Sequence, residues 1–405
     1  MGEQLSQTTE GINRCPQERK EPLSMQEIGG LIQDYLRENS FLPARLIQQG
    51  GVVDFIKPRT ESAGLNECPY TGEDCRLEQM LEIANRPFCI ILAIHPEMKE
   101  VIVKVRTKED PRKSADNEII FLESVSPALD SIMLGQNEEL ASRIKIPKFL
   151  GSKREEMPIF CVEEYLEGQV AGGIHRADPE VLDYRDIEVL INFMRFFQDQ
   201  LDYEKVKQTA PEANFPVVDV CKNYLGDFSR RREKLESCLG RELVDAMEAI
   251  LRKNEDLIRG GRAVFSSRDI NSANIIKTKS DQLVLIDWER TGFVNNSAFE
   301  YGFLFADLFS NPELQAKFLE AAKKVNKDDP DFLEKFRSDF LFNRGSGELC
   351  YWLTASENAS SQEEQKICHD AITKFSELLK AAITKSDIWA EEPLTENERA
   401  SDSII

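Results

Sequence analysis

The chain has 405 residues, a formal net charge of −21 and an apolar fraction of 41%. This length exceeds one average domain and accommodates a two-lobed enzyme with extensions. The acidity argues against nucleic acid or an anionic membrane as the main partner, because both are negatively charged. It is compatible with a cationic substrate, although an acidic balance usually means only a soluble surface.

The cellular location is predicted from cysteines and apolar runs. Nine cysteines are scattered without a Cys-x-x-Cys pair, which is typical of free thiols in a reducing cytoplasm. No apolar run approaches the ~18 residues of a membrane span. The first residues are polar and lack the apolar core of a signal peptide. We therefore expect a cytoplasmic protein without a membrane partner.

Residues 1–75 are expected to form an N-terminal extension with one amphipathic helix. Ser24 and Glu27 form the capping-box pattern that begins a helix. One apolar stripe follows, made by Ile28, Leu31, Ile32, Tyr35 and Leu36. The stripe predicts that the helix docks on a neighbouring lobe. Residues 50–75 are rich in Gly, Pro, Thr and Asn and are expected to be a connection.

Residues 76–165 are expected to form a strand-rich lobe. Strands are predicted at 76–82, 88–94 and 101–105, and Lys104 lies in the last of them. A helix is predicted to start near Glu118. Two further strands are predicted at 143–150 and 158–162, and the second leads into Glu164 and Tyr165.

Residues 166–390 are expected to be mainly helical. Residues 187–197 are apolar almost all round, which predicts a buried helix. Residues 219–260 predict two or more amphipathic helices. Asn311 with Pro312, and Ser361 with Glu364, are helix-start patterns. The acidic residues 391–405 are expected to be a disordered tail.

Three polar residues stand out between the apolar runs of residues 264–289. Asp269 and Asn274 share one tight loop, and Asp287 follows the apolar strand 283–286. Hard oxygen ligands of this kind suit Mg²⁺, which takes few protein ligands plus waters and substrate phosphates.

The spacing D-x-x-x-x-N, followed by a hairpin and I-D-W-E, resembles the aminoglycoside phosphotransferase-like kinases. These are small-molecule relatives of the protein kinases, whose corresponding motifs are H-R-D-x-x-x-x-N and D-F-G. The resemblance implies an α+β, protein-kinase-like fold with a small β-rich N-lobe and a larger helical C-lobe. It also implies that Asp269 accepts the proton of the attacking hydroxyl. Asn274 and Asp287 would hold Mg²⁺ on the phosphates of ATP.

The resemblance also assigns the nucleotide-binding residues of the N-lobe. Lys104 matches the lysine that pairs with the α- and β-phosphates, and Glu118 is expected to hold it, with Glu123 as the alternative. Glu164 and Tyr165 match the hinge, whose backbone would read the adenine edge.

The chain departs from the family pattern at three places. Ser267 stands where small-molecule kinases have a histidine, and the loop 83–87 has no glycine. Glu300 stands where an Asp is usual. The link from Asp287 to Glu300 is too short for the activation segment of a protein kinase, which favours a small hydroxyl acceptor. Asp307 and Glu289 are expected to be helix-capping or solvated acids, with ligands of a cationic substrate as the alternative.

Three functions remain open from the sequence. The leading hypothesis is an ATP- and Mg²⁺-dependent phosphotransferase acting on a hydroxyl of a small molecule. The alternative is a non-catalytic kinase-fold protein that binds a nucleotide or a partner, motivated by Ser267 and the glycine-free loop. A protein kinase is the third.

Overall fold

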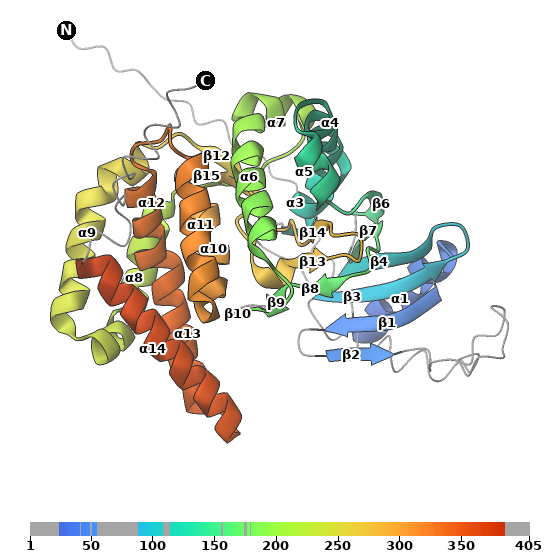
Figure 1. Cartoon of the computed structure of the whole chain (residues 1–405). Coiled ribbons are helices and arrows are strands. Elements are labelled where there is room, and N and C mark those ends of the chain that lie inside the picture. Colours follow the sequence, from blue (N-terminus) through green and yellow to red (C-terminus); the bar gives the residue numbers. More distant parts are fainter. Residues whose placement is uncertain are drawn as a thin grey trace, which may run out of the picture.

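The computed structural model describes residues 24–40, 42–48, 51–54, 88–107, 114–154, 157–173, 176–178 and 180–384. These residues form two lobes (Figure 1). The first is built around a β-sheet, and the second is mostly helical. The predicted α+β fold, a small β-rich lobe followed by a larger helical one, is confirmed.

The N-lobe contains one antiparallel six-stranded sheet in the order β2-β1-β3-β4-β7-β6. Apolar residues alternate along β4, so that Val101, Val103 and Val105 are buried on one face. Lys104 consequently lies on the other face. The strands are β1 (Leu42–Gln48), β2 (Gly51–Asp54), β3 (Phe88–His95), β4 (Lys99–Arg106), β6 (Phe149–Lys153) and β7 (Ile159–Glu164).

The N-lobe starts earlier in the chain than predicted. β1 pairs with β3 and β2 pairs with β1, although residues 1–75 were expected to be an extension and residues 50–75 a connection. The sequence of β1 contains Pro43, which falls where the pairing register shifts, and this obscures the strand pattern. The predicted strand 76–82, the loop 83–87 and the tail 391–405 lie outside the described residues.

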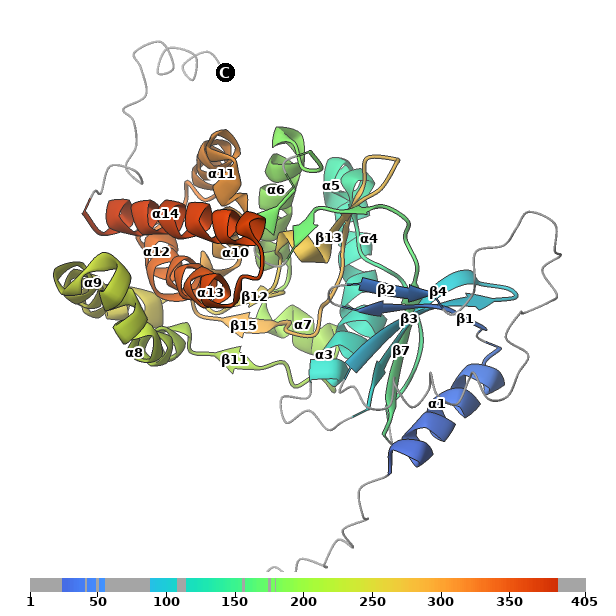
Figure 2. The same cartoon turned by 90° about the horizontal axis from the view of Figure 1, so that it is seen from below.

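Helix α1 (Met25–Glu38) covers one face of this sheet (Figure 2). The capping box at Ser24 and Glu27 is present, as predicted. Ile32 is fully buried, and the ring of Tyr35 stacks on Phe160 of β7 with centroids 3.8 Å apart. The apolar stripe therefore docks on the N-lobe.

The region between β4 and β7 contains four consecutive helical segments. They are α3 (Ser114–Ile120), the π-helical η1 (Phe121–Val125), α4 (Ser126–Gln136) and α5 (Glu138–Arg143). The single strand predicted at 143–150 is wrong. Residues Ile144–Lys145 form β5, which pairs with β14 (Leu283–Leu285) of the C-lobe, whereas β6 pairs with β7. Pro147 separates the two strands, because it has no amide hydrogen for a ladder.

The C-lobe helices enclose a large apolar core. The predicted buried helix is α6, and Ile187, Leu190 and Phe193 are fully buried in it. Asn311 caps α11 and Ser361 caps the start of α14, as predicted. The helices are α6 (Tyr184–Gln200), α7 (Tyr203–Thr209), α8 (Val220–Leu239), α9 (Arg241–Arg259), α10 (Phe299–Asp307), η3 (Leu308–Ser310), α11 (Pro312–Val325), α12 (Phe332–Asp339), the π-helical η4 (Phe340–Arg344), α13 (Gly345–Asn358) and α14 (Gln362–Thr384).

Short strands join the lobes and carry the loops of the site. They form sheets in the orders β5-β14-β13-β8, β11-β15-β12 and β10-β9. Their bounds are β8 (Gln169–Val170), β9 (Gly172–Gly173), β10 (Arg176–Ala177), β11 (Val217–Val218), β12 (Val264–Ser266), β13 (Ile275–Lys277), β14 (Leu283–Leu285) and β15 (Gly292–Val294). A short 3₁₀ helix, η2 (Ser272–Asn274), lies between β12 and β13. Within the described ranges, no helix is long and apolar enough to cross a membrane.

Candidate active site

Lys104 is buried on β4 and paired with Glu118. Its Nζ lies 2.5 Å from Oε1 of Glu118, which α3 presents to the sheet. Glu123, the alternative partner, lies 3.6 Å from Arg154 instead. Burial alone would lower the pKa of Lys104, but the carboxylates of Glu118 and Glu163 outweigh it and keep this pKa well above its usual value. Lys104 is therefore a buried cation.

Glu163 is a second partner of Lys104 that the sequence reasoning missed. Its Oε1 lies 3.0 Å from Nζ of Lys104, and the side chain is only 3% exposed. Among the described residues, its Oε2 has no hydrogen-bond partner. Because Lys104 lies opposite Cys161 across the β4–β7 ladder, strand alternation puts residue 163 on the face of Lys104. That two-residue period is the signal that identifies it.

The two expected hinge residues lie where β7 leaves the sheet. Glu164 is the last residue of β7, and its amide already donates to the carbonyl of Lys148. Tyr165 starts the following loop, which reaches Gly168. A Cβ at Gly168 would lie 2.6 Å from the carbonyl oxygen of Lys277, so the loop packs tightly against β13. The structure places both residues at the junction of the lobes.

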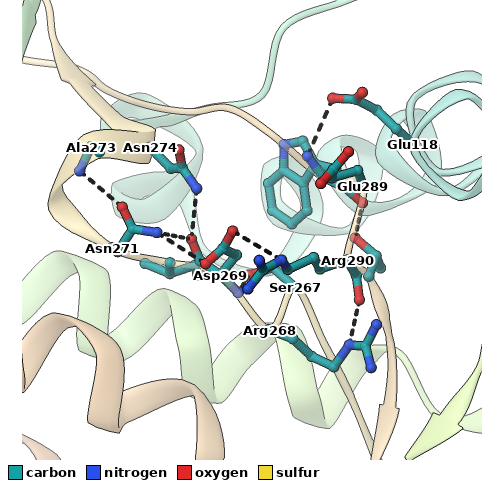
Figure 3. Close-up of polar contacts among 12 residues, drawn as sticks. Glu118, Ser267, Arg268, Asp269, Asn271, Ala273, Asn274, Glu289 and Arg290 are labelled. Atoms are coloured by element: carbon teal, nitrogen blue, oxygen red, sulfur yellow. Dashed lines mark hydrogen bonds and ion pairs between the residues drawn. The ribbon is translucent and has the colours of Figure 1, made fainter. Parts of the chain in front are cut away.

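Asp269 is held in place by two amides of its own loop (Figure 3). Nδ2 of Asn271 donates to its Oδ1 at 3.0 Å, and Nδ2 of Asn274 donates to its carbonyl oxygen at 3.0 Å. Nε of Arg290 lies 3.6 Å from its Oδ2. The Asp269 carboxylate thus has a fixed orientation beside a cation.

Glu300 anchors the loop that carries Asp269. Its carboxylate accepts from the hydroxyls of Ser266 and Ser267, the latter at 2.7 Å. It also accepts from the amides of Arg268 at 3.0 Å and Ile270 at 3.1 Å. Arg268 has a φ of 61°, a left-handed conformation that the surrounding contacts must enforce. Ser267, in the place of the usual histidine, is therefore part of the loop's support.

Asp307 supports the same loop through Ser272. Its Oδ2 accepts from the amide of Ser272 at 2.7 Å and from its hydroxyl at 2.8 Å. The side chain is fully buried, which raises the pKa of Asp307 to about 7. Its expected role as a capping or solvated acid is therefore wrong. Glu289, the other such acid, pairs with Arg106 at 2.7 Å.

Asn274 and Asp287 are brought together by the β13–β14 hairpin. The amide of Ile286, next to Asp287, donates to the carbonyl of Asn274 at 3.0 Å. Asp287 has a φ of 64°, which turns the chain sharply after β14. The next amide, that of Trp288, donates to Glu118 at 3.3 Å. Glu118 therefore links Lys104 to the segment carrying Asp287.

The electrostatics around Asp287 fit a bound divalent cation. Burial, reinforced by the nearby Glu118 carboxylate, raises the pKa of Asp287 to about 7. A dication beside the carboxylate would offset both effects. Asn274 uses its amide nitrogen on Asp269, so its oxygen is the atom that can face a cation. A carboxylate and an amide oxygen are hard ligands of the kind that Mg²⁺ binds together with phosphates.

A cavity of about 820 Å³ opens beside the loop that carries Asp269. Arg268 and Arg290 line it next to Asp269, and Tyr224 of α8 lines another wall. This volume is within the usual range of about 300–1,000 Å³ for small-molecule sites.

Known proteins resemble this chain in structure. No protein-family model matches the sequence, and no curated protein matches it. Among solved structures, the GDP and kanamycin complex of APH(2")-IIia covers 73% of this chain and 89% of its own, with 14% identity and a TM-score of 0.47. The macrolide 2'-phosphotransferase of Brachybacterium faecium covers 71% and 89%, with 12% identity and a TM-score of 0.44.

A third similar structure is the ethanolamine kinase of Plasmodium vivax. It covers 74% of this chain and 81% of its own, with 12% identity and a TM-score of 0.40.

Proposed function

We propose that this chain is an aminoglycoside phosphotransferase-like kinase that moves the γ-phosphate of ATP to a hydroxyl of a small molecule, with Mg²⁺. One observation carries the proposal: residues from three distant segments converge at the junction of the lobes. Hydrogen bonds connect these segments. Glu118 joins Lys104 to the segment of Asp287 through the amide of Trp288. Asn274 is joined to the Asp269 loop by its side chain and to the segment of Asp287 through Ile286.

In this function Asp269 accepts the proton of the acceptor hydroxyl. The hydroxyl oxygen forms the new bond to the γ-phosphorus, and the bond from this phosphorus to the bridging oxygen breaks, releasing ADP. Asn271 fixes the accepting carboxylate by donating to its Oδ1. Such positioning is the main contribution of a protein to phosphoryl transfer.

The other residues neutralise and orient the nucleotide. Lys104 is a buried cation that would contact the α- and β-phosphates, and Glu118 holds its ammonium group in place. Asn274 and Asp287 would hold Mg²⁺, which supplies positive charge to the phosphate oxygens. Glu164 and Tyr165 would present the hinge backbone to the base.

A transfer assay tests this function. Purified protein is incubated with ATP or GTP, Mg²⁺ and a panel of hydroxyl compounds, and nucleoside diphosphate release is measured. We expect acceptor-dependent release that falls at least a hundredfold in Asp269→Asn, with nucleotide binding retained. Nucleotide binding without acceptor-dependent release, across a broad panel, would instead support the non-catalytic binding protein. Phosphate transfer to polypeptides only would support a protein kinase.

A further inference from the structure

We propose that the acceptor carries an anionic group, a carboxylate or a phosphate ester, which binds in the 820 Å³ cavity beside the loop that carries Asp269. That the ligand accepts a phosphate rests on the proposed function. That the ligand is an anion rests on the cavity itself. The strong acidity of the whole chain gives no hint of this preference, because 72 acidic residues face 51 basic ones.

The lining of the cavity has the opposite charge balance. Four arginines face only two carboxylates there. The charged lining residues are Arg106, Arg230, Arg268, Arg290, Asp227 and Glu289. In a chain with so many more acids than bases, this local excess of arginine marks a site for negative charge.

Both carboxylates are already engaged by arginines of the chain. Glu289 pairs with Arg106 at 2.7 Å, and Asp227 pairs with Arg230 on the same face of α8. Arg268 and Arg290 add two further positive charges to the lining. Arg290 lies 3.6 Å from Asp269 and is half exposed. Even with Asp269 included, cations outnumber anions around the cavity.

Part of the cavity lining is polar, and hydrogen bonds to Asp339 fix its side chains. Asp339, which is fully buried, accepts from the hydroxyl of Tyr224 at 2.7 Å and from Nδ2 of Asn343 at 3.0 Å. Both donors line the cavity. Asn343 belongs to the π-helical segment η4, an arrangement often found at functional sites. Tyr224 and Asn343 thus both donate to Oδ1 of Asp339.

The remaining wall is apolar and is backed by another cation. Phe299 and Phe303 line the cavity, and the guanidinium of Arg344 lies 3.7 Å from the centroid of the Phe303 ring. An apolar wall suits the carbon skeleton of a ligand. An ammonium group would meet like charge on the arginine wall, which is costly, whereas guanidinium groups bind carboxylates and phosphates well.

Matched ligands test the ligand class directly. The first set is glycerate, glycerol phosphate, glycerol and aminopropanediol, and the second is gluconate, glucose phosphate, glucose and glucosamine. Each set shares one skeleton and differs in charge. Binding is measured by calorimetry and saturation-transfer NMR, with a non-hydrolysable ATP analogue and Mg²⁺ filling the nucleotide site. The two anions of each set separate a carboxylate from a phosphate preference.

We expect at least one anion to bind at least tenfold more tightly than its neutral and cationic counterparts. Arg290→Gln should weaken that binding about tenfold, and Arg290→Lys should weaken it less, because the charge is kept. The matched control is Arg252→Gln, an exposed arginine paired along α9 with Glu248 and remote from the cavity lining. It should bind as wild type.

Two results overturn the proposal: a cationic or neutral member that binds as tightly as the anions, or anion binding that is the same in Arg290→Gln. Anion binding that depends on Arg290 but leads to no phosphate transfer would keep the ligand class and refute the kinase function. Transfer to a cationic acceptor would keep the kinase function and refute the ligand class.

Discussion

Glu163 lies 3.0 Å from the ammonium nitrogen of Lys104, and both side chains are buried. Lys104 therefore faces two carboxylates before any nucleotide is bound. In the proposed function, phosphates that approach Lys104 would compete with Glu163 and meet its negative charge. Burial raises the pKa of Glu163, which reflects the cost of keeping this carboxylate charged.

Glu163→Gln should therefore strengthen nucleotide binding. The amide oxygen can still accept from Lys104, but the negative charge is gone. We expect the Kd for MgATP to fall by about three- to tenfold, roughly 0.6–1.4 kcal/mol. Calorimetry measures it, with the exposed Glu167→Gln as control. Weaker binding in Glu163→Gln would show instead that Glu163 helps to hold Lys104 in its binding position.

Glu300→Ala should disorder the loop of Asp269. Four groups of the loop donate to this carboxylate, and its removal leaves buried donors without an acceptor. Each orphaned donor costs about 1–3 kcal/mol. We expect lower thermal stability and a kcat at least a hundredfold lower, and Glu300→Asp should recover part of both.

The Kd for nucleotide distinguishes a local effect of Glu300 on the loop of Asp269 from an effect on the nucleotide site. Lys104 and Asp287 do not contact Glu300 directly, so the Kd for nucleotide should stay within about threefold of wild type when Glu300 is replaced. A kcat unchanged in folded Glu300→Ala would contradict the anchoring role.

The stability of the protein should fall as the pH rises from 5 to 7. Burial raises the pKa of Asp339 to about 7, from an ordinary value of 3.8. A carboxyl group with a raised pKa binds its proton more tightly in the native state. Its stabilisation is therefore complete at low pH and is lost as the pH rises towards 7, by about 1.4 kcal/mol per pH unit.

Asp339→Asn removes this titration and should make the slope less steep, while Asp287 and Asp307, whose pKa is also raised to about 7, keep part of it. Urea unfolding followed by intrinsic fluorescence at pH 5, 6, 7 and 8 measures the slope. The exposed Asp328→Asn serves as the control and should follow wild type. An Asp339→Asn profile parallel to that of wild type would mean that Asp339 does not titrate in this range.

The sequence predicted the loop and the hairpin that carry Asp269, Asn274 and Asp287, whose roles remain predictions. Asp269, Asn274 and Asp287 stand out because they interrupt apolar strands, and the hairpin that joins them is local. Lys104 and Glu118 required the family resemblance, since they are fourteen positions apart, one on strand β4 and the other on helix α3. Their contact follows the expected pairing, whereas their roles towards a nucleotide remain predictions.

The anchors of the loop, the start of the N-lobe and the cavity depend on long-range contacts that no local sequence pattern shows. Glu300 reaches Ser267 across 33 residues, and Asp307 reaches Ser272 across 35. β1 is defined by its pairing with β3 rather than by its own sequence, so the start of the N-lobe was misplaced. The arginine-lined cavity joins residues 106, 230, 268 and 290, and its charge is hidden by the acidic average of the chain.

The most direct test of the central claim is thermal melting with ATP or GTP, with and without Mg²⁺, for wild type and Asp287→Ala. A ligand that binds only the native state at 100 times its Kd stabilises it by about 2.7 kcal/mol, which raises the melting temperature. We predict a rise that requires Mg²⁺ in wild type and is absent in Asp287→Ala. No rise with either nucleotide, or the same Mg²⁺-dependent rise in Asp287→Ala, would contradict the assignment of this site.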